Sequence, residues 1–94
     1  MRYNQEKVEA AKILTGKILE LNQKLPENRC VMFEITGILH PAYIVTFCVK
    51  NQRTQAFNME RTFTVLLSEA DGENRFSEIC AYMKKWEEAY CKWI

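Results

Sequence analysis

The sequence offers one histidine and four cysteines as candidates for nucleophilic catalysis. His40 is the only histidine of the chain, and Cys30 and Cys48 are the cysteines nearest to it. A cysteine nucleophile needs its histidine within hydrogen-bond distance, about 2.6–3.2 Å. The hairpin predicted below places both cysteines several residues from His40, at about 3.3 Å per residue along a strand. We therefore expect a solvated loop histidine, and we predict no catalytic residue.

The same residue types could bind a metal, but their spacing does not favour it. Structural zinc sites take ligands from close pairs such as CxxC, whereas the cysteines of this chain are isolated. An acidic segment lacks the DxDxDG spacing of a calcium loop, and its carboxylates suit the positive end of a helix. We predict no metal site and no cofactor. The residues concerned are Cys30, Cys48, Cys80 and Cys91, and Glu69, Asp71, Glu73 and Glu78.

Two amphipathic patterns with apolar residues three and four apart predict a helix at each end of the chain. The first helix should begin after Asn4 as N-cap and run to about Lys24, before Leu25-Pro26. Gly16 in its middle indicates close packing or a local bend, because glycine costs about 1 kcal/mol there. The second helix should start between Asp71 and Arg75 and run almost to Ile94. The apolar positions are Ala11, Leu14, Ile18, Leu21 and Leu25, then Phe76, Ile79, Met83, Trp86, Tyr90 and Trp93.

Between the helices the apolar residues alternate, which predicts β-strands. Residues 30–35 and 42–50 form a hairpin centred near Leu39, so that Cys30 opposes Cys48 and Val31 opposes Phe47. Asn51-Gln52 is the expected turn into a third strand. The alternation Phe57, Met59, Arg61, Phe63, Val65 and Leu67 fits one long strand, or a loop followed by a strand from about Glu60, so residues 51–60 stay open between strand and loop.

These elements predict an α+β fold: a single two-layer domain over residues 1–94, in the order αβββα, with both helices on one face of a three-stranded antiparallel sheet. The heavier apolar face of the sheet should take the helices. We expect Phe33, Phe47, Phe63, Leu21 and Met83 in one core. The full heavier face is Val31, Phe33, Ile35, Tyr43, Val45, Phe47, Val49, Phe63, Val65 and Leu67.

The opposite face of the sheet carries few charges for a surface in water, which predicts a contact surface for a second copy or another protein. An ordinary threonine-rich sheet surface is the alternative interpretation. The predicted partner-binding residues are Met32, Glu34, Ile44, Thr46, Cys48, Thr64 and Leu66. A second candidate is the aromatic series Trp86, Tyr90 and Trp93, whose helical spacing first indicates core residues and whose place near the chain end allows interface anchors.

Charge and composition exclude several classes of function. Thirteen Lys and Arg residues face twelve Asp and Glu residues, so no net field attracts nucleic acid or an anionic membrane. No apolar stretch approaches the ~20 residues of a membrane span, and the N-terminus has no signal-like segment. We expect a cytoplasmic protein with reduced thiols, in which Cys30 and Cys48 would be the first pair to bridge under mild oxidation.

The predicted element order resembles that of the double-stranded RNA-binding domain. Gly37 and His40 are also similar to that family's first hairpin loop. In that family a lysine-rich start to the last helix binds phosphates. Here the corresponding segment, 68–73, reads SEADGE, which would repel them. The resemblance therefore implies the topology but not the RNA-binding function.

These observations favour a small non-enzymatic protein that acts by protein–protein interaction and self-associates. Regulators and inhibitors, including those of phages and mobile elements, are often chains of this kind. A nucleic-acid-binding module is one alternative, through the sheet edge or a patch of Lys50, Arg53 and Arg61. A small-ligand binder or enzyme that uses the loop from Gly37 to Pro41 is the other.

Overall fold

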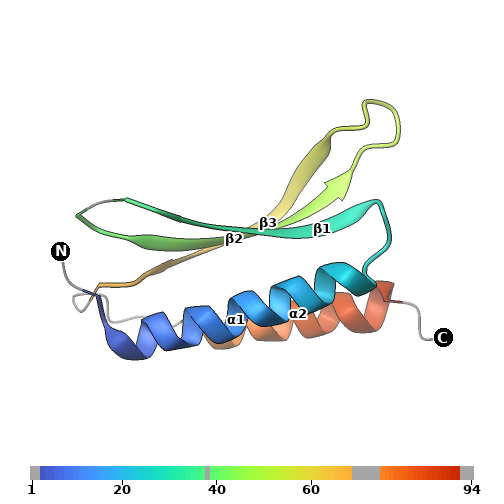
Figure 1. The fold of residues 1–94 in the computed structure, drawn as a ribbon. Helices are drawn as coiled ribbons and strands as arrows, with labels where there is room; N and C mark the ends of the chain where they lie inside the picture. The colour runs from blue at the N-terminus through green and yellow to red at the C-terminus, as the bar shows by residue number, and fades with distance from the viewer. Residues whose placement is uncertain (1–2, 38, 69–74, 92–94) are drawn as a thin grey trace.

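The computed structural model describes residues 3–37, 39–68 and 75–91. Its elements are α1 (Gln5–Lys24), β1 (Arg29–Thr36), β2 (Ala42–Lys50), β3 (Phe57–Leu66) and α2 (Phe76–Tyr90). The three strands form one sheet, and the two helices lie side by side beneath one of its faces (Figure 1). This confirms the predicted α+β fold and its element order.

Helix α1 begins and ends where the sequence predicts. Asn4 is the N-cap, and its side-chain oxygen accepts the N–H of Lys7 at 3.2 Å. Leu25 is the C-cap in an extended conformation, directly before Pro26. Local capping therefore sets both helix ends, while the buried stripe holds the helix against the sheet. That stripe includes Ala11, Leu14, Ile18 and Leu21.

Gly16 lies on the exposed side of α1, so the predicted close packing is wrong. A Cβ added at this position would meet no atom within 4 Å. We expect Gly16→Ala to stabilise the protein by about 0.5–1 kcal/mol, because alanine loses less backbone entropy in a helix. Urea unfolding of the two proteins measures the difference. A less stable alanine variant would contradict this prediction, because it would mean that the protein needs a glycine at this position.

Helix α2 is shorter than predicted. It begins at Phe76, after Arg75 as N-cap, and ends at Tyr90. Cys91 is extended (φ −81°, ψ 130°), and its side chain is buried in the core, so the chain leaves the helix where this thiol packs. The expected continuation almost to Ile94 is therefore wrong. Residues 69–74 and 92–94, including the predicted acidic cap and Trp93, lie outside the described part of the chain.

The pairing of β1 with β2 has the predicted register: Cys30 faces Cys48 and Val31 faces Phe47. The connection from β2 to β3 differs, because the loop spans 51–56 and is not a two-residue turn. The side chain of Asn51 accepts the N–H groups of the loop at positions 53 and 54, at 2.8 and 3.2 Å. This asparagine builds a longer turn of its own, in which Gln55 takes the left-handed conformation (φ 61°).

Strand β3 is one long strand with a β-bulge. Arg61 pairs with Phe47, but Met59 pairs with the next residue, Cys48, so that Glu60 is inserted between them. An inserted residue reverses the facing of all residues beyond it. Met59 therefore lies on the sheet face opposite to Phe63, and so does Phe57, which pairs with Lys50. Of the two alternatives that the sequence leaves open for this segment, the structure has the long strand, and the bulge interrupts its alternation.

One hydrophobic core fills the space between the sheet and the helices. Phe47 is fully buried, with its ring centroid 6.0 Å from that of Phe63 and 5.0 Å from that of Trp86. Leu21 and Met83 are buried in the same cluster, as predicted. Phe33 and Ile35 are not: they are 39% and 60% exposed although they lie on the helix-facing side of β1.

The path of α1 explains this exposure. Near its C-terminal end, α1 bonds to the edge strand through Asn22 and Val31. At its N-terminal end, the N–H of Asn4 bonds to the C=O of Leu67, just after β3, at 2.8 Å. The helix therefore crosses the sheet from β1 toward β3, and it leaves the last residues of β1 uncovered.

Candidate functional site

The face of the sheet opposite to the helices, here called the outer face, holds the predicted partner-binding residues of the strands. Met32 is 57% and Leu66 38% exposed, and Ile44 between them is partly exposed. Cys48 is buried, with its Sγ 3.8 Å from the Sδ of Met32. The register brings Glu34, Thr46 and Thr64 onto the same face, because Glu34 and Thr64 both pair with Ile44 and Thr46 pairs with Met32.

The bulge adds two apolar residues to this face that the sequence did not reveal. Met59 is 75% exposed and Phe57 is also exposed. The sequence leaves residues 51–60 open between strand and loop and assigns neither residue to a face, and no glycine marks the bulge at Glu60. The outer face is therefore more apolar than the sequence suggests, and methionine, a flexible side chain, is its most exposed apolar type.

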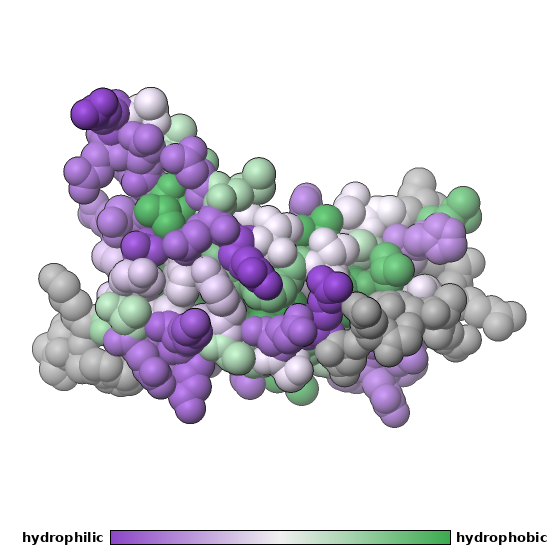
Figure 2. All heavy atoms as spheres, turned by 180° about the vertical axis from the view of Figure 1, so that it is seen from behind, coloured by the Kyte–Doolittle hydropathy of each residue, from purple (hydrophilic) through white to green (hydrophobic). Residues whose placement is uncertain are grey.

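The β2–β3 hairpin carries these added residues away from the helical layer. Figure 1 shows its end rising above the rest of the sheet. Seen from behind, the tip of the hairpin is hydrophilic, and the surface below it mixes hydrophobic and hydrophilic side chains (Figure 2). The loop 51–56 at this tip is mostly polar, and the exposed apolar residues Phe57 and Met59 follow it at the start of β3.

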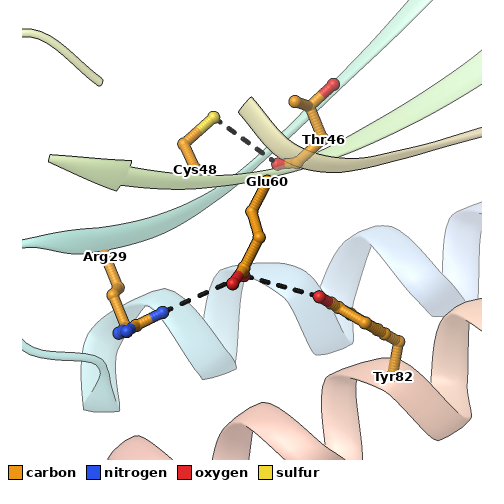
Figure 3. Close-up of polar contacts among 5 residues, drawn as sticks. All are labelled: Arg29, Thr46, Cys48, Glu60 and Tyr82. Carbon is orange, nitrogen blue, oxygen red and sulfur yellow. Dashed lines mark hydrogen bonds and ion pairs between the residues drawn. The ribbon is translucent and has the colours of Figure 1, made fainter. Parts of the chain in front are cut away.

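Two long polar contacts beneath the sheet accompany the bulge. Glu60 points toward the helices and lies between Arg29 and Tyr82 (Figure 3). The hydroxyl of Tyr82 donates to its carboxylate at 3.4 Å, and the guanidinium of Arg29 lies 3.9 Å from the same oxygen. That guanidinium also stacks 3.5 Å above the ring of Tyr90. The Nη1 of Arg29 forms no hydrogen bond to the described residues, so the ion pair to Glu60 is a long one, and the ring of Tyr90 orients the guanidinium rather than Glu60 itself. Both contacts favour the position of the inserted residue beneath the sheet.

The aromatic series of α2 lies mainly in the core. Trp86 is only 3% exposed, and Tyr90 is half-buried beneath Arg29. Trp93 lies outside the described residues. The helical spacing of Trp86 and Tyr90 thus reflects packing, as its first interpretation held.

The residues of the first hairpin loop have structural roles. Gly37 has φ +95°, and a Cβ there would lie 2.7 Å from the carbonyl oxygen of His40. The carbonyl of Pro41 accepts the N–H of Leu67 at 2.8 Å, which ties the loop to the end of β3. His40 is exposed. Within residues 3–37, 39–68 and 75–91, no group of three histidine, cysteine or acidic side chains could hold a metal ion.

All four cysteines are free thiols. Cys30 and Cys48 are directly opposed on adjacent strands. Such residues have Cα atoms about 4.5–5.5 Å apart, within the range of a disulfide. Burial raises the pKa of Cys30, and the neighbouring Cys48 raises it further.

We expect mild oxidation to form the Cys30–Cys48 disulfide first, and slowly at neutral pH. The raised pKa keeps the Cys30 thiol protonated, so the rate should rise as the pH passes above the usual range of a cysteine, where the thiolate forms. Peptide mapping by mass spectrometry over a pH series measures this rate. A disulfide between Cys80 and Cys91 within one folded chain would contradict the course of α2.

Comparison with known proteins gives no match, either to a family model, to a curated protein or to a solved structure. Among the described residues, no helix has the length and apolar character needed to cross a bilayer.

Proposed function

We propose that this chain is a small non-enzymatic protein that acts by binding another protein through its outer face, and that it also self-associates there. The observation that carries the proposal is the exposure of Met32, Met59, Phe57 and Leu66 on one sheet face. Exposed apolar side chains gathered on one face are typical of protein interfaces. The free thiols fit a reducing compartment, so we place this function in the cytoplasm.

Capture of partners from native lysate tests this function. The matched baits are the wild-type protein and the variants Ile44→Lys and Leu66→Lys, each with and without nuclease treatment. We expect a protein that the wild type retains after nuclease and that both lysine variants lose. Binding that nuclease abolishes, or that both variants retain, would contradict the proposal.

Nucleic-acid binding has less support, because two basic residues of the predicted patch, Lys50 and Arg61, lie on opposite faces of the sheet. Lys50 pairs with Phe57 on the outer face, whereas Arg61 pairs with Phe47 on the helix-facing side. The guanidinium of Arg61 lies 4.8 Å from the ring centroid of Phe63. A stripe of phosphate contacts needs cations along one surface.

We therefore expect only weak and unspecific binding of duplex RNA or DNA. A fluorescence-anisotropy titration at about 150 mM salt should give no sub-micromolar affinity, because few cations are available for counterion release. Sub-micromolar binding with a steep salt dependence would favour nucleic-acid binding over protein binding as the function.

A further inference from the structure

β1 is an edge strand, and within the described residues part of its outward backbone has no hydrogen-bond partner. Val31 bonds to the side-chain amide of Asn22 through both its N–H and its C=O, at 2.8 Å each. Alternate residues of an antiparallel strand direct their backbone groups to the same side, so Phe33 and Ile35 direct theirs outward as Val31 does. Within the described residues, the outward N–H and C=O groups of Phe33 and Ile35 form no hydrogen bond. We call these four groups the open edge of β1.

An apolar hollow lies beside the open edge. A groove of about 340 Å³ runs between the N-terminal part of α1 and the sheet, and Val8, Ala11, Ile35 and Leu67 line it. Leu19 is 53% exposed and lies on the flank of α1 that faces β1, since it is three residues before Asn22. A strand added to the open edge would place alternate side chains against these apolar residues and would cover the exposed ring of Phe33.

The carboxylate of Glu34, at the centre of the open edge, indicates which charge the added strand should carry. Glu34 lies between Phe33 and Ile35, on the outer face opposite Ile44. Its carboxylate is exposed and has no ion pair within the described chain. A basic residue directly across from it would form a favourable cross-strand pair.

We propose that the open edge of β1 binds an extended strand of another protein, in which two apolar residues opposite Phe33 and Ile35 flank a basic residue opposite Glu34. The backbone of this strand supplies the complementary N–H and C=O groups, as in other cases of strand addition. The inference rests on the proposed function in that it takes the partner to be a protein, but it uses the edge of the sheet, which shares only Glu34 with the outer face.

A second copy of this chain fits the open edge less well. Antiparallel pairing of two β1 strands that matches Phe33 with Ile35 of the other copy places Glu34 opposite its own counterpart. Like charges directly opposed across strands are destabilising. The other edge of the sheet also offers less, because the helix-facing residues Phe63 and Val65 of β3 are already buried.

A peptide titration followed by NMR tests the inference. The probe is a seven-residue peptide with Ile-Lys-Ile at its centre and serine and threonine at its ends, added to the isotope-labelled full chain. We expect shifts of the Phe33 and Ile35 amide signals and protection of both amides from hydrogen exchange. Shifts confined to outer-face residues such as Ile44 and Leu66, or no binding at millimolar peptide, would overturn the inference.

Two variants show whether backbone pairing and charge cause the binding. Ile35→Pro removes the outward N–H without removing a bond to β2, so it should abolish binding, whereas Ile35→Val should retain it. Glu34→Lys should weaken the Ile-Lys-Ile peptide by about five- to tenfold and strengthen an Ile-Glu-Ile peptide, because the cross-strand pair changes sign. If Ile35→Pro does not fold by circular dichroism, the charge reversal decides alone. Unchanged affinity in the folded proline variant, or no reversal with Glu34→Lys, would overturn the inference.

Separate results identify failure of the proposed function. If the Ile44→Lys variant loses its lysate partner but the peptide does not bind to the open edge, the outer face is the binding surface and the edge proposal is wrong. If the peptide binds to the open edge but the Ile44→Lys variant still captures the partner, the edge site is supported and the outer-face proposal is wrong. A wild-type dimer that Ile35→Pro dissociates would make a second copy the occupant and would contradict the partner strand proposed here.

Discussion

Replacing Phe47 with alanine should destabilise the protein by about 3–5 kcal/mol. This ring is fully buried, and its edge-to-face contacts with Tyr82 and Trp86, at centroid distances of 4.5 and 5.0 Å, join the sheet to α2. Truncation removes the buried apolar ring and leaves a cavity between the sheet and the helices, which cannot move together to fill it. Equilibrium unfolding in urea measures the loss.

Phe57→Ala is the matched control for this truncation. The same residue type lies exposed on the outer face, so its loss should cost less than about 1 kcal/mol. A cost below about half a kilocalorie per mole for Phe47→Ala, or equal costs for the two variants, would show that the faces of the strands are misassigned.

Introducing lysine into the outer face should abolish self-association and partner binding. In Ile44→Lys and Leu66→Lys an ammonium would be buried where the partner closes, at a cost on the order of several kcal/mol in a dry interface. Size-exclusion chromatography should show loss of the oligomer or complex, with an unchanged circular dichroism spectrum. Ile13→Lys on the exposed side of α1 is the control and should bind like the wild type. If the wild type is a monomer and both lysine variants bind the partner as the wild type does, the outer face is not a binding surface.

The sequence predicts those features of the fold that local patterns specify. The period of Ala11, Leu14 and Ile18 defines the buried stripe of α1, and Asn4 defines its start. The register of β1 and β2 follows from their alternation, because a slip of one residue would turn Phe47 out of the core.

The remaining features depend on contacts between distant residues. The inserted Glu60 contacts Arg29 and Tyr82, which lie in other elements, so the alternation of β3 alone cannot show that Met59 faces outward. The exposure of Ile35 likewise depends on the direction in which α1 crosses the sheet. The candidate site was therefore predicted for β1 and β2 and incompletely for β3.

Hydroxyl-radical footprinting of the free protein and of its complex tests the central claim, that the outer face is the binding surface. Met32 and Met59 are exposed and react readily, while the buried Met83 reports on unfolding and the exposed Ile13 on general shielding. We expect oxidation of Met32 and Met59 to slow strongly in the complex, or at concentrations where the chain self-associates, with Ile13 and Met83 unchanged. Unchanged rates at both outer-face methionines in a complex that forms would contradict it.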